Sequence, residues 1–514
     1  QSLGDKDKLA VRAQLQWNPA DAIDLRLGAH FAQDKSDEQG LYLLKPFAPG
    51  SGAPTVPADT SRYVTGWALS PTFAKIIGRS VDSKPGLDDS NNGLDLTANV
   101  DFGGAKLTSI TAYNKLIRRE YADWDATQYA DSDEYLNSDL NVFSEELRLA
   151  STGNGRFGWV TGVFYSDEDL HENFYSDLTD RLGGIALTTY EQVANSVGVF
   201  AQGNYQFTDS LKGVLGVRED HESRELIGLN TAFLPGVPSL AGGALGGSIT
   251  SNLPSGKISL DYQAALGTMI YGTISRGVKS GGFTAHNTLS APAADPFAPE
   301  KLTAYEVGVK SDVARTLRVN ASVFYYRYKD QQILGKIFDD VSQSYIGRFV
   351  NADARISGGE VELEWHPGGG FFVSQYAGFA EGYYTSQLLN SDAPPVDYNG
   401  MAESFPKWSY GGDLSYSWRI GALQLTAESN YSFHDTYSQF FLLGSNDFTI
   451  PKYWLANANV SLTPAAGAPW TVTLWGRNIF NRSYDITRNF FLPSSEVAAA
   501  GEPATVGIRL NYKY

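Results

Sequence analysis

Glutamates occupy every second position of the segment GEVELEW, at Glu360, Glu362 and Glu364, and apolar residues stand between them. In an extended strand this alternation places all three carboxylates on one face. Carboxylates in a row repel one another and are stabilised by cationic hydrogen-bond donors. The pattern therefore indicates binding of a positively charged partner, and the alternative is simple solvation of a wide polar channel.

Charged and apolar residues also alternate in other segments. If the apolar face of each strand meets lipid, the opposite face carries Glu146 and Arg148 in FSEELRLAS, Glu306 in YEVGVK and Arg509 in the final strand. A Lys or Arg on the lipid face would cost about 2–4 kcal/mol at mid-membrane, which favours the inward assignment. These four residues join the glutamate row as candidate lumen contacts for a domain held inside a channel.

Two further groups of residues lie in predicted loops. Aromatic residues beside carboxylates offer a surface for small molecules, at Tyr121, Trp124 and Tyr129. Cationic residues near the glycine-rich run SGGFTAHN suit a negatively charged ligand, at Arg276, Lys279 and His286. The alternative for the aromatic residues is a girdle at the membrane interface, and the alternative for Lys279 is loop architecture. All six are candidate ligand contacts on the outer surface.

The sequence carries no motif of a known catalytic class. GxSxG, Walker and HExxH patterns are absent, so hydrolase, nucleotide and zinc-protease chemistry are not indicated. The six His residues lack metal-ligand spacing, and the acidic run from Asp82 to Asp89 lacks a recognised Ca²⁺ pattern. We therefore predict a protein that is not an enzyme, has no metal site and uses no cofactor.

Composition restricts the class of protein further. The 514 residues include 52 Gly, 29 Tyr and no Cys, which is typical of a large β protein of an oxidising compartment. A formal net charge of −17 argues against nucleic acid as a partner, because nucleic-acid binding needs a basic face. No run of 18 consecutive apolar residues offers a transmembrane helix. A membrane barrel fits these facts, because half of each barrel strand is polar.

Alternating segments of about ten residues, joined by tight turns and long polar loops in turn, recur along the whole chain. The final strand ATVGIRLNYKY alternates throughout, and the preceding WTVTLWGRNIF is its hairpin partner. We count about 19 such strands and expect a loop around residues 171–191. The predicted fold is all-β, a transmembrane antiparallel β-barrel with short periplasmic turns and long extracellular loops.

The strand count bears on the start of the chain. Each long loop precedes a descending strand, so the first and the last strand both descend towards the periplasm. Closed bacterial barrels normally have an even strand number, and an open edge in lipid leaves backbone groups unpaired. We therefore expect at least one further strand, and by preference three, to precede Gln1 or to come from another chain.

Several segments resemble TonB-dependent outer-membrane receptors. They follow one another from about residue 140 to the end: FSEELRLAS, ISRGVKSGGF, PEKLTAYEVGVKSD, SVFYYRYKDQQI, NADARISGGEVELEW, GRNIFNRSYD and GEPATVGIRLNYKY. The resemblance implies a barrel of about 22 strands around an N-terminal plug domain that carries a TonB box. We find no counterpart of plug or box, so residues 1–514 are expected to be the barrel domain, with the plug and first strands missing or in a separate segment.

The resemblance implies energised import across the outer membrane of a Gram-negative cell. The TonB–ExbB–ExbD complex would act through the plug, and a scarce nutrient would pass the lumen. A ferric siderophore is the leading cargo, and a saccharide or an aromatic compound is the alternative. A passive channel is the second interpretation, and a soluble β-propeller is the third. Expected partners are that complex, the plug, outer-membrane lipid, lipopolysaccharide and a small-molecule cargo, but no nucleic acid.

Overall fold

The computed structural model describes residues 3–48, 54–234, 245–285, 295–339, 344–386, 399–400, 402–439, 448–465, 467, 469–491 and 495–513. Within these ranges the chain forms strands almost throughout, and the two helices are short: α1 (Pro71–Ile76) and α2 (Thr179–Leu182). No helix in the described part of the chain has the length and apolar character to cross a membrane.

Twenty strands form one antiparallel sheet. They are β1 (Lys8–Ala20), β2 (Ile23–Asp34), β4 (Gly86–Leu87), β5 (Asp89–Asp101), β6 (Ala105–Asp123), β7 (Asp133–Ser151), β8 (Phe157–Leu178), β9 (Gly184–Thr208), β10 (Leu211–Leu234), β11 (Leu245–Ala265), β12 (Thr268–Lys279), β13 (Glu300–Ala314), β14 (Leu317–Asp339), β15 (Ser344–Gly368), β16 (Phe371–Tyr384), β17 (Trp408–Ile420), β18 (Leu423–His434), β21 (Tyr453–Pro464), β22 (Trp470–Arg477) and β25 (Thr505–Tyr512). Apart from β4, which adds two residues beside β6, the strands follow chain order as neighbours. The prediction of about 19 strands is confirmed.

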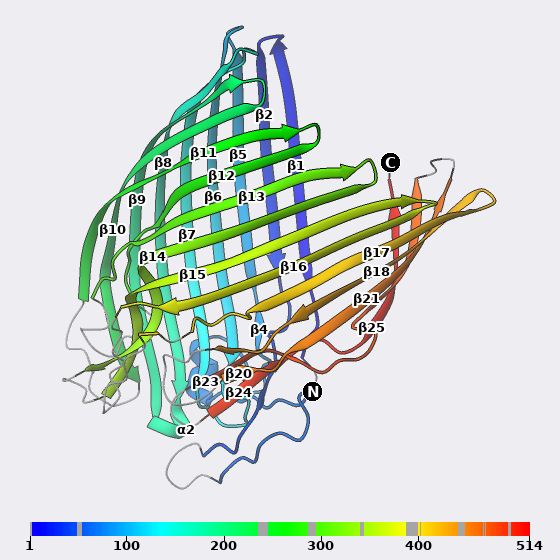
Figure 1. The fold of residues 1–514 in the computed structure, drawn as a ribbon. Coiled ribbons are helices and arrows are strands. Elements are labelled where there is room, and N and C mark those ends of the chain that lie inside the picture. Colours follow the sequence, from blue (N-terminus) through cyan, green and yellow to red (C-terminus); the bar gives the residue numbers. More distant parts are fainter. Residues whose placement is uncertain are drawn as a thin grey trace.

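The sheet curves into a barrel-like wall (Figure 1). Each strand of the wall hydrogen-bonds to the next, from the β1–β2 pair to the β22–β25 pair. Within the described residues no pairing joins β1 to β25, so these two strands are the edges of the wall. Their outward backbone N–H and C=O groups are consequently available for pairing with further strands.

The two ends of the wall differ. Short turns join the strands of each hairpin at one end, such as residues 21–22, 266–267 and 421–422. The other end carries the long connections, including residues 35–88 and 478–504. Figure 1 places the start of β1 at the loop end and the end of β25 at the turn end, as the count of descending strands predicts.

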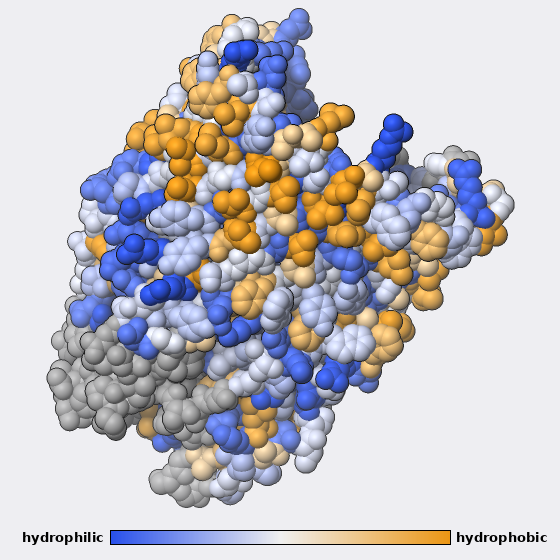
Figure 2. Space-filling model, in the orientation of Figure 1, coloured by the Kyte–Doolittle hydropathy of each residue, from blue (hydrophilic) through white to orange (hydrophobic). Residues whose placement is uncertain are grey.

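The strand faces alternate as expected of a membrane wall. On β25, Val506, Ile508 and Leu510 are 81%, 76% and 71% exposed, so none lies in a packed protein interior. Figure 2 shows that apolar residues gather on the outward surface of the wall, towards the ends that carry the short turns. Strands such as β9 and β10 are longer than the roughly ten residues that cross a bilayer, so their loop ends project beyond it.

A small group of elements, here called the cap, lies at the loop end (Figure 1). It consists of one sheet formed by β3 (Leu41–Leu43), β23 (Asp485–Phe491) and β24 (Ser495–Ala500), and of the pair β19 (Tyr437–Gln439) and β20 (Phe448–Ile450). Its core contains Leu43, Phe47 and Val497, each at most 1% exposed. Burying an apolar side chain of this size stabilises by about 1.5–3 kcal/mol, so this core fastens residues near both ends of the chain together.

Asn478 follows β22 directly and orders the connection that leads from β22 to β23. Its side-chain amide donates to the carbonyl oxygens of Arg482 at 2.8 Å and Glu502 at 2.9 Å, and its Oδ1 accepts from the Arg482 N–H at 2.8 Å. Asn478 and Asn481 have φ of 45° and 47°, a left-handed conformation that Asn tolerates better than most residues. The turn that follows β22 is thereby fixed by backbone-directed bonds.

Candidate functional site

The glutamate row lies on the face of β15 opposite Val361, which is 43% exposed on the outward side. Glu360 accepts a hydrogen bond from Ser322 Oγ at 3.2 Å, and Glu364 lies 4.0 Å from Arg318 Nη1. Glu362 has no ion pair within the described residues. The carboxylate oxygens of the row can therefore still accept hydrogen bonds on the inner face. The role of the row as a plug contact stays a prediction.

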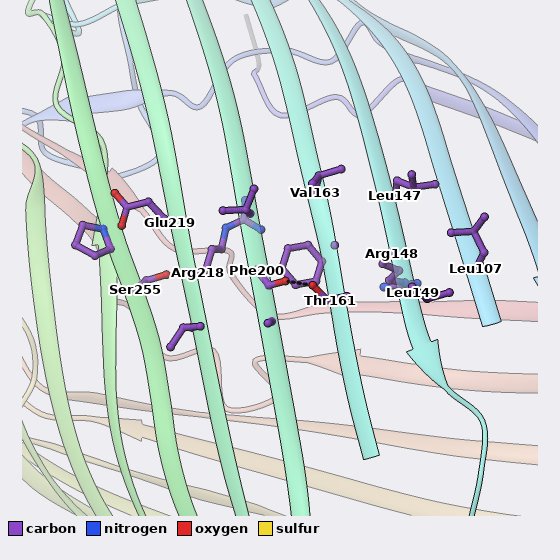
Figure 3. Close-up of a pocket in the computed structure, with 15 residues that line it drawn as sticks. Leu107, Leu147, Arg148, Leu149, Thr161, Val163, Phe200, Arg218, Glu219 and Ser255 are labelled. Atoms are coloured by element: carbon purple, nitrogen blue, oxygen red, sulfur yellow. Dashed lines mark hydrogen bonds between the residues drawn. The ribbon is translucent and has the colours of Figure 1, made fainter. Parts of the chain in front are cut away.

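Glu146 and Arg148 share one face of β7, with Arg148 Nη1 3.3 Å from Glu146 Oε1. Leu147 and Leu149 occupy the opposite face, which places the ion pair on the inner side. Figure 3 shows Leu147, Leu149 and Val163 lining a hollow that extends from β7 to β10, on the face opposite the ion pair. Arg148 and Arg218 belong to the strands that form this hollow.

Arg218 is the centre of a charged and aromatic cluster beside this pair. It bonds Asp220 through Nε at 2.6 Å and Nη2 at 2.5 Å, and its guanidinium lies 5.5 Å from the Phe164 ring and 5.6 Å from the Phe200 ring. Gly198 permits this arrangement, because a Cβ there would stand 2.5 Å from Arg218 Nη2. The inner face therefore offers fixed cations and rings, which suit either a plug or a passing anionic solute.

Two other predicted lumen residues lie on inner faces. Glu306 accepts a hydrogen bond from Tyr271 Oη at 2.6 Å, and Lys310 Nζ lies 5.7 Å from the same ring. Arg509 pairs in register with Thr473 and alternates with the exposed apolar residues of β25. Their positions agree with the inward assignment, and their contacts with a plug stay predictions.

The aromatic loop candidates occupy packing positions. Tyr121 is 0% exposed between Leu69 and Phe73, and its hydroxyl donates to Asp133 Oδ1 at 3.0 Å. Its predicted contact with cargo is therefore wrong for this structure, because neighbouring loops cover the ring. Trp124 packs against the cap core, and Tyr129 Oη donates to the Pro54 carbonyl at 3.4 Å.

The predicted cationic group is not one cluster. Arg276 lies on the outward face of β12 with Ile270 and Ile274, whereas Lys279 has the opposite orientation on the same strand. Side chains alternate between the two faces of a strand, so two residues three positions apart point to opposite sides. Arg276 and Lys279 are therefore close in sequence but cannot contact the same ligand. His286 lies outside the described residues.

The cap contains a site that sequence reasoning missed, here called the mouth cluster (Tyr42, Arg62, Asp485 and Arg488). Asp485 is 3% exposed and accepts hydrogen bonds from Tyr42 Oη at 2.7 Å, Arg62 Nη1 at 3.0 Å and Arg488 Nε at 2.9 Å. Two guanidinium groups share one carboxylate, so the cluster carries a net positive charge. Burial and the hydrogen bond to Asp485 raise the pKa of Tyr42 to about 12.

An aromatic stack adjoins the mouth cluster. Ring centroids lie 5.0 Å apart for His434 and Tyr453, and 4.8 Å apart for Tyr453 and Tyr484. The backbone carbonyl of Tyr484 accepts from Arg62 Nη1 at 3.1 Å, which links the stack to the cluster. The only sequence signal was the run NRSYD, in which an aromatic residue directly precedes the acid.

The wall, its two faces and the loops at one end define an outer-membrane β-barrel. The family model described as TonB dependent receptor-like, beta-barrel, matches residues 33–479. The chain belongs to this family. TonB-dependent receptors are transporters, not enzymes, and they take up small-molecule cargo across the outer membrane of Gram-negative bacteria in partnership with TonB.

Solved structures with this fold extend over the whole chain. The ferric yersiniabactin uptake receptor FyuA from Yersinia pestis matches with a TM-score of 0.78 at 17% identity, over 100% of this chain and 71% of that one. The siderophore receptor PiuA from Acinetobacter baumannii matches with a TM-score of 0.75 at 14% identity, over 100% and 76%. The copper transporter OprC matches with a TM-score of 0.68 at 14% identity, over 99% and 74%.

Proposed function

We propose that this receptor imports a ferric siderophore. The observation that carries the proposal is the mouth cluster, in which two arginines share one carboxylate beside a stack of aromatic rings. The side chains of Arg62 and Arg488 are 30% and 26% exposed, so both keep donors for an incoming ligand. Excess positive charge and flat aromatic faces suit an anionic iron chelate with aromatic groups.

The names of similar structures support a ferric siderophore as the class of cargo, but they do not identify one compound. FyuA is named for ferric yersiniabactin and PiuA for a siderophore, whereas OprC is named for copper. A saccharide is the weaker candidate, because it would not need the net positive charge of the mouth cluster. An aromatic compound without iron would use the stack of His434, Tyr453 and Tyr484 alone.

The test measures ligand binding to the full-length protein in detergent, and quenching of intrinsic fluorescence reports the binding. The probes are a ferric catecholate, a ferric hydroxamate, a maltodextrin and a metal-free aromatic acid. We expect a ferric complex to bind, and Arg488→Gln to weaken it roughly 10- to 100-fold, because a charge-assisted hydrogen bond contributes about 1.5–3 kcal/mol. The control Arg482→Gln, an exposed residue just before β23, should change affinity less than twofold. Binding of the maltodextrin alone would reject the proposal.

We also propose that the bore holds a plug and that further strands close the wall between β1 and β25. The acceptors of the glutamate row and the edges of the sheet support this arrangement. The TonB–ExbB–ExbD complex would then act on the plug. Conductance of the full-length product in a planar bilayer tests it: small, rare currents are expected, and large constitutive currents would favour the passive channel instead.

Lipopolysaccharide is the outer-leaflet partner that we propose for the wall. Arg276, Arg327 and Arg355 lie in one cross-strand row on the outward face of β12 to β15, and none has an ion-pair partner within the described residues. The exposed rings of Tyr305 and Tyr325, 6.3 Å apart, lie beside this row towards the turn end and suit the membrane interface. Unpaired arginines just beyond an aromatic girdle suit lipid phosphates.

Lipid A binding tests this partner. The triple variant Arg276→Gln/Arg327→Gln/Arg355→Gln should lose at least tenfold in affinity for bisphosphorylated lipid A, and the loss should shrink for the dephosphorylated form. Arg419→Gln, an exposed arginine at the end of β17 with the short turns, is the matched control. Equal loss in both lipids would contradict phosphate recognition.

A further inference from the structure

Three aspartates meet at the tip of the β6–β7 hairpin. Asp123 ends β6, Asp125 lies in the connection and Asp133 begins β7. One carboxylate oxygen of each lies within 4.8 Å of the corresponding oxygens of the other two. Asp123 is 6% exposed, and Asp125 and Asp133 are 0% exposed. Aspartates are seldom buried so completely, least of all three together.

Each carboxylate is held by one oxygen and leaves the other free. Asp123 Oδ1 accepts from the Ala126 N–H at 2.7 Å, and Asp125 Oδ1 accepts from the Thr127 N–H at 2.8 Å. Asp133 Oδ1 accepts from the Tyr121 hydroxyl. In all three aspartates Oδ2 is buried and has no hydrogen-bond partner within the described residues. The protein thus orients three acceptors that it does not itself satisfy.

Among the described residues no ion pair neutralises this cluster. Arg181 is a nearby guanidinium, but its ion pair is with Asp131, at 3.5 Å from Nε to Oδ1. None of the ion pairs among the described residues includes Asp123, Asp125 or Asp133. Buried carboxylates without a counter-charge are strongly destabilising, and bound cations are a common way of compensating them.

We propose that Asp123, Asp125 and Asp133 bind one Ca²⁺ ion at the extracellular side of the barrel. Two oxygens that each lie about 2.4 Å from one Ca²⁺ can be at most about 4.8 Å apart, and the three acid oxygens lie within this limit. The donor set consists entirely of carboxylates. Hard cations such as Ca²⁺ prefer these oxygen ligands, whereas zinc and copper favour nitrogen and sulfur ligands. Ca²⁺ is favoured over Mg²⁺, because Mg²⁺ keeps most of its water and does not use a dry cage of side chains.

The ion would fasten several loops to the hairpin tip. The Ala126 carbonyl accepts from the Gly66 N–H at 3.1 Å, and Asp180 Oδ2 accepts from the Ala130 N–H at 2.8 Å. Ala126 also belongs to the core of the cap, with Leu43 and Val497. Because the ion would offset most of the negative charge of the three carboxylates, the tip would hold the connection between β2 and β5, the β8–β9 end and the cap in register.

The test uses the full-length protein in detergent with terbium(III) as a luminescent probe for the Ca²⁺ site. Tyr121 and Trp124 adjoin the acids and should sensitise the emission. We expect Ca²⁺ to displace the probe at concentrations at least tenfold lower than Mg²⁺ does. Asp125→Asn should remove most of the signal, whereas Asp82→Asn, an exposed acid of the β2–β5 connection, should leave it unchanged. Asp169, His171 and Glu191 form a second, partly exposed group that could bind the probe. The luminescence that remains in Asp125→Asn is expected to come from this group.

Hydrogen exchange of the unmodified chain makes the test independent of how the variant folds. The Ala126 and Thr127 amides should exchange at least tenfold faster with EGTA than with Ca²⁺, because the carboxylates that hold them would then repel one another. Equal exchange in both conditions, an unchanged signal in Asp125→Asn, or displacement by Mg²⁺ as effective as that by Ca²⁺ would each overturn the proposal.

Discussion

Replacing Asp485 by Asn should loosen the cap while the wall stays intact. Removing one member of a buried ion pair costs about 3–5 kcal/mol. The two arginines are about 30% and 26% exposed, so water offsets part of this cost and we expect about 2–3 kcal/mol. The amide keeps the volume of the acid and one acceptor for Tyr42, so the loss reports the charge.

Hydrogen exchange measures this loss where it occurs. The amides of β24, paired with β3, should exchange roughly 30- to 150-fold faster in Asp485→Asn, because each 1.4 kcal/mol is about tenfold. The control is Glu502→Gln, which removes an ion pair with Arg477 at 3.9 Å whose partners are 63% and 60% exposed. That variant should exchange within twofold of the unmodified chain. Equal rates in both variants would refute the assignment of Asp485 as the fastener of the cap.

Three further predictions concern the wall, the stack and the phenol. Val307→Arg on the outward face should destabilise the folded barrel in liposomes by about 2 kcal/mol, whereas Asn320→Arg on the inner face should be tolerated. Gly501→Ala should weaken ferric-complex binding, because its Cβ would stand 2.1 Å from the Tyr484 ring; the Tyr484 fluorescence environment and the affinity should change together. The pKa of the Tyr42 phenol is raised from 10.0 to about 12, so its hydrogen bond should stabilise the cap fully below pH 10 and lose this effect as pH rises through 12. Absorbance at 295 nm, compared with that of Tyr42→Phe, measures the ionisation of this phenol.

The wall was predictable because its signal repeats. A period of two over many segments fixes which residues face outward, and Val506, Ile508 and Leu510 follow it. The ends of the strands were not predictable in the same way. The segment around residues 171–191 was expected to be a loop, but β8 and β9 continue through most of it, because ladder bonds with β7 and β10 extend strands whose local sequence is polar.

The candidate site was less predictable, because it depends on contacts between distant segments. No local pattern tells that Asp485 meets Tyr42 across 443 residues of chain. Tyr121 illustrates the opposite error: an aromatic residue beside carboxylates suggested a ligand surface, but α1 covers its ring. Arg276 and Lys279 were close in sequence and on opposite faces, so charge alone could not assign them to one ligand.

The pairing of β3 with β24 sets a condition on assembly. Residues 41–43 are synthesised long before their strand partner, residues 497–499. Until then β3 presents an unsatisfied edge, and closing so long a loop carries an entropic penalty that local contacts do not repay. The cap sheet can therefore form only after β24 has been synthesised and has reached β3, so a formed cap reports that these two distant segments have come together.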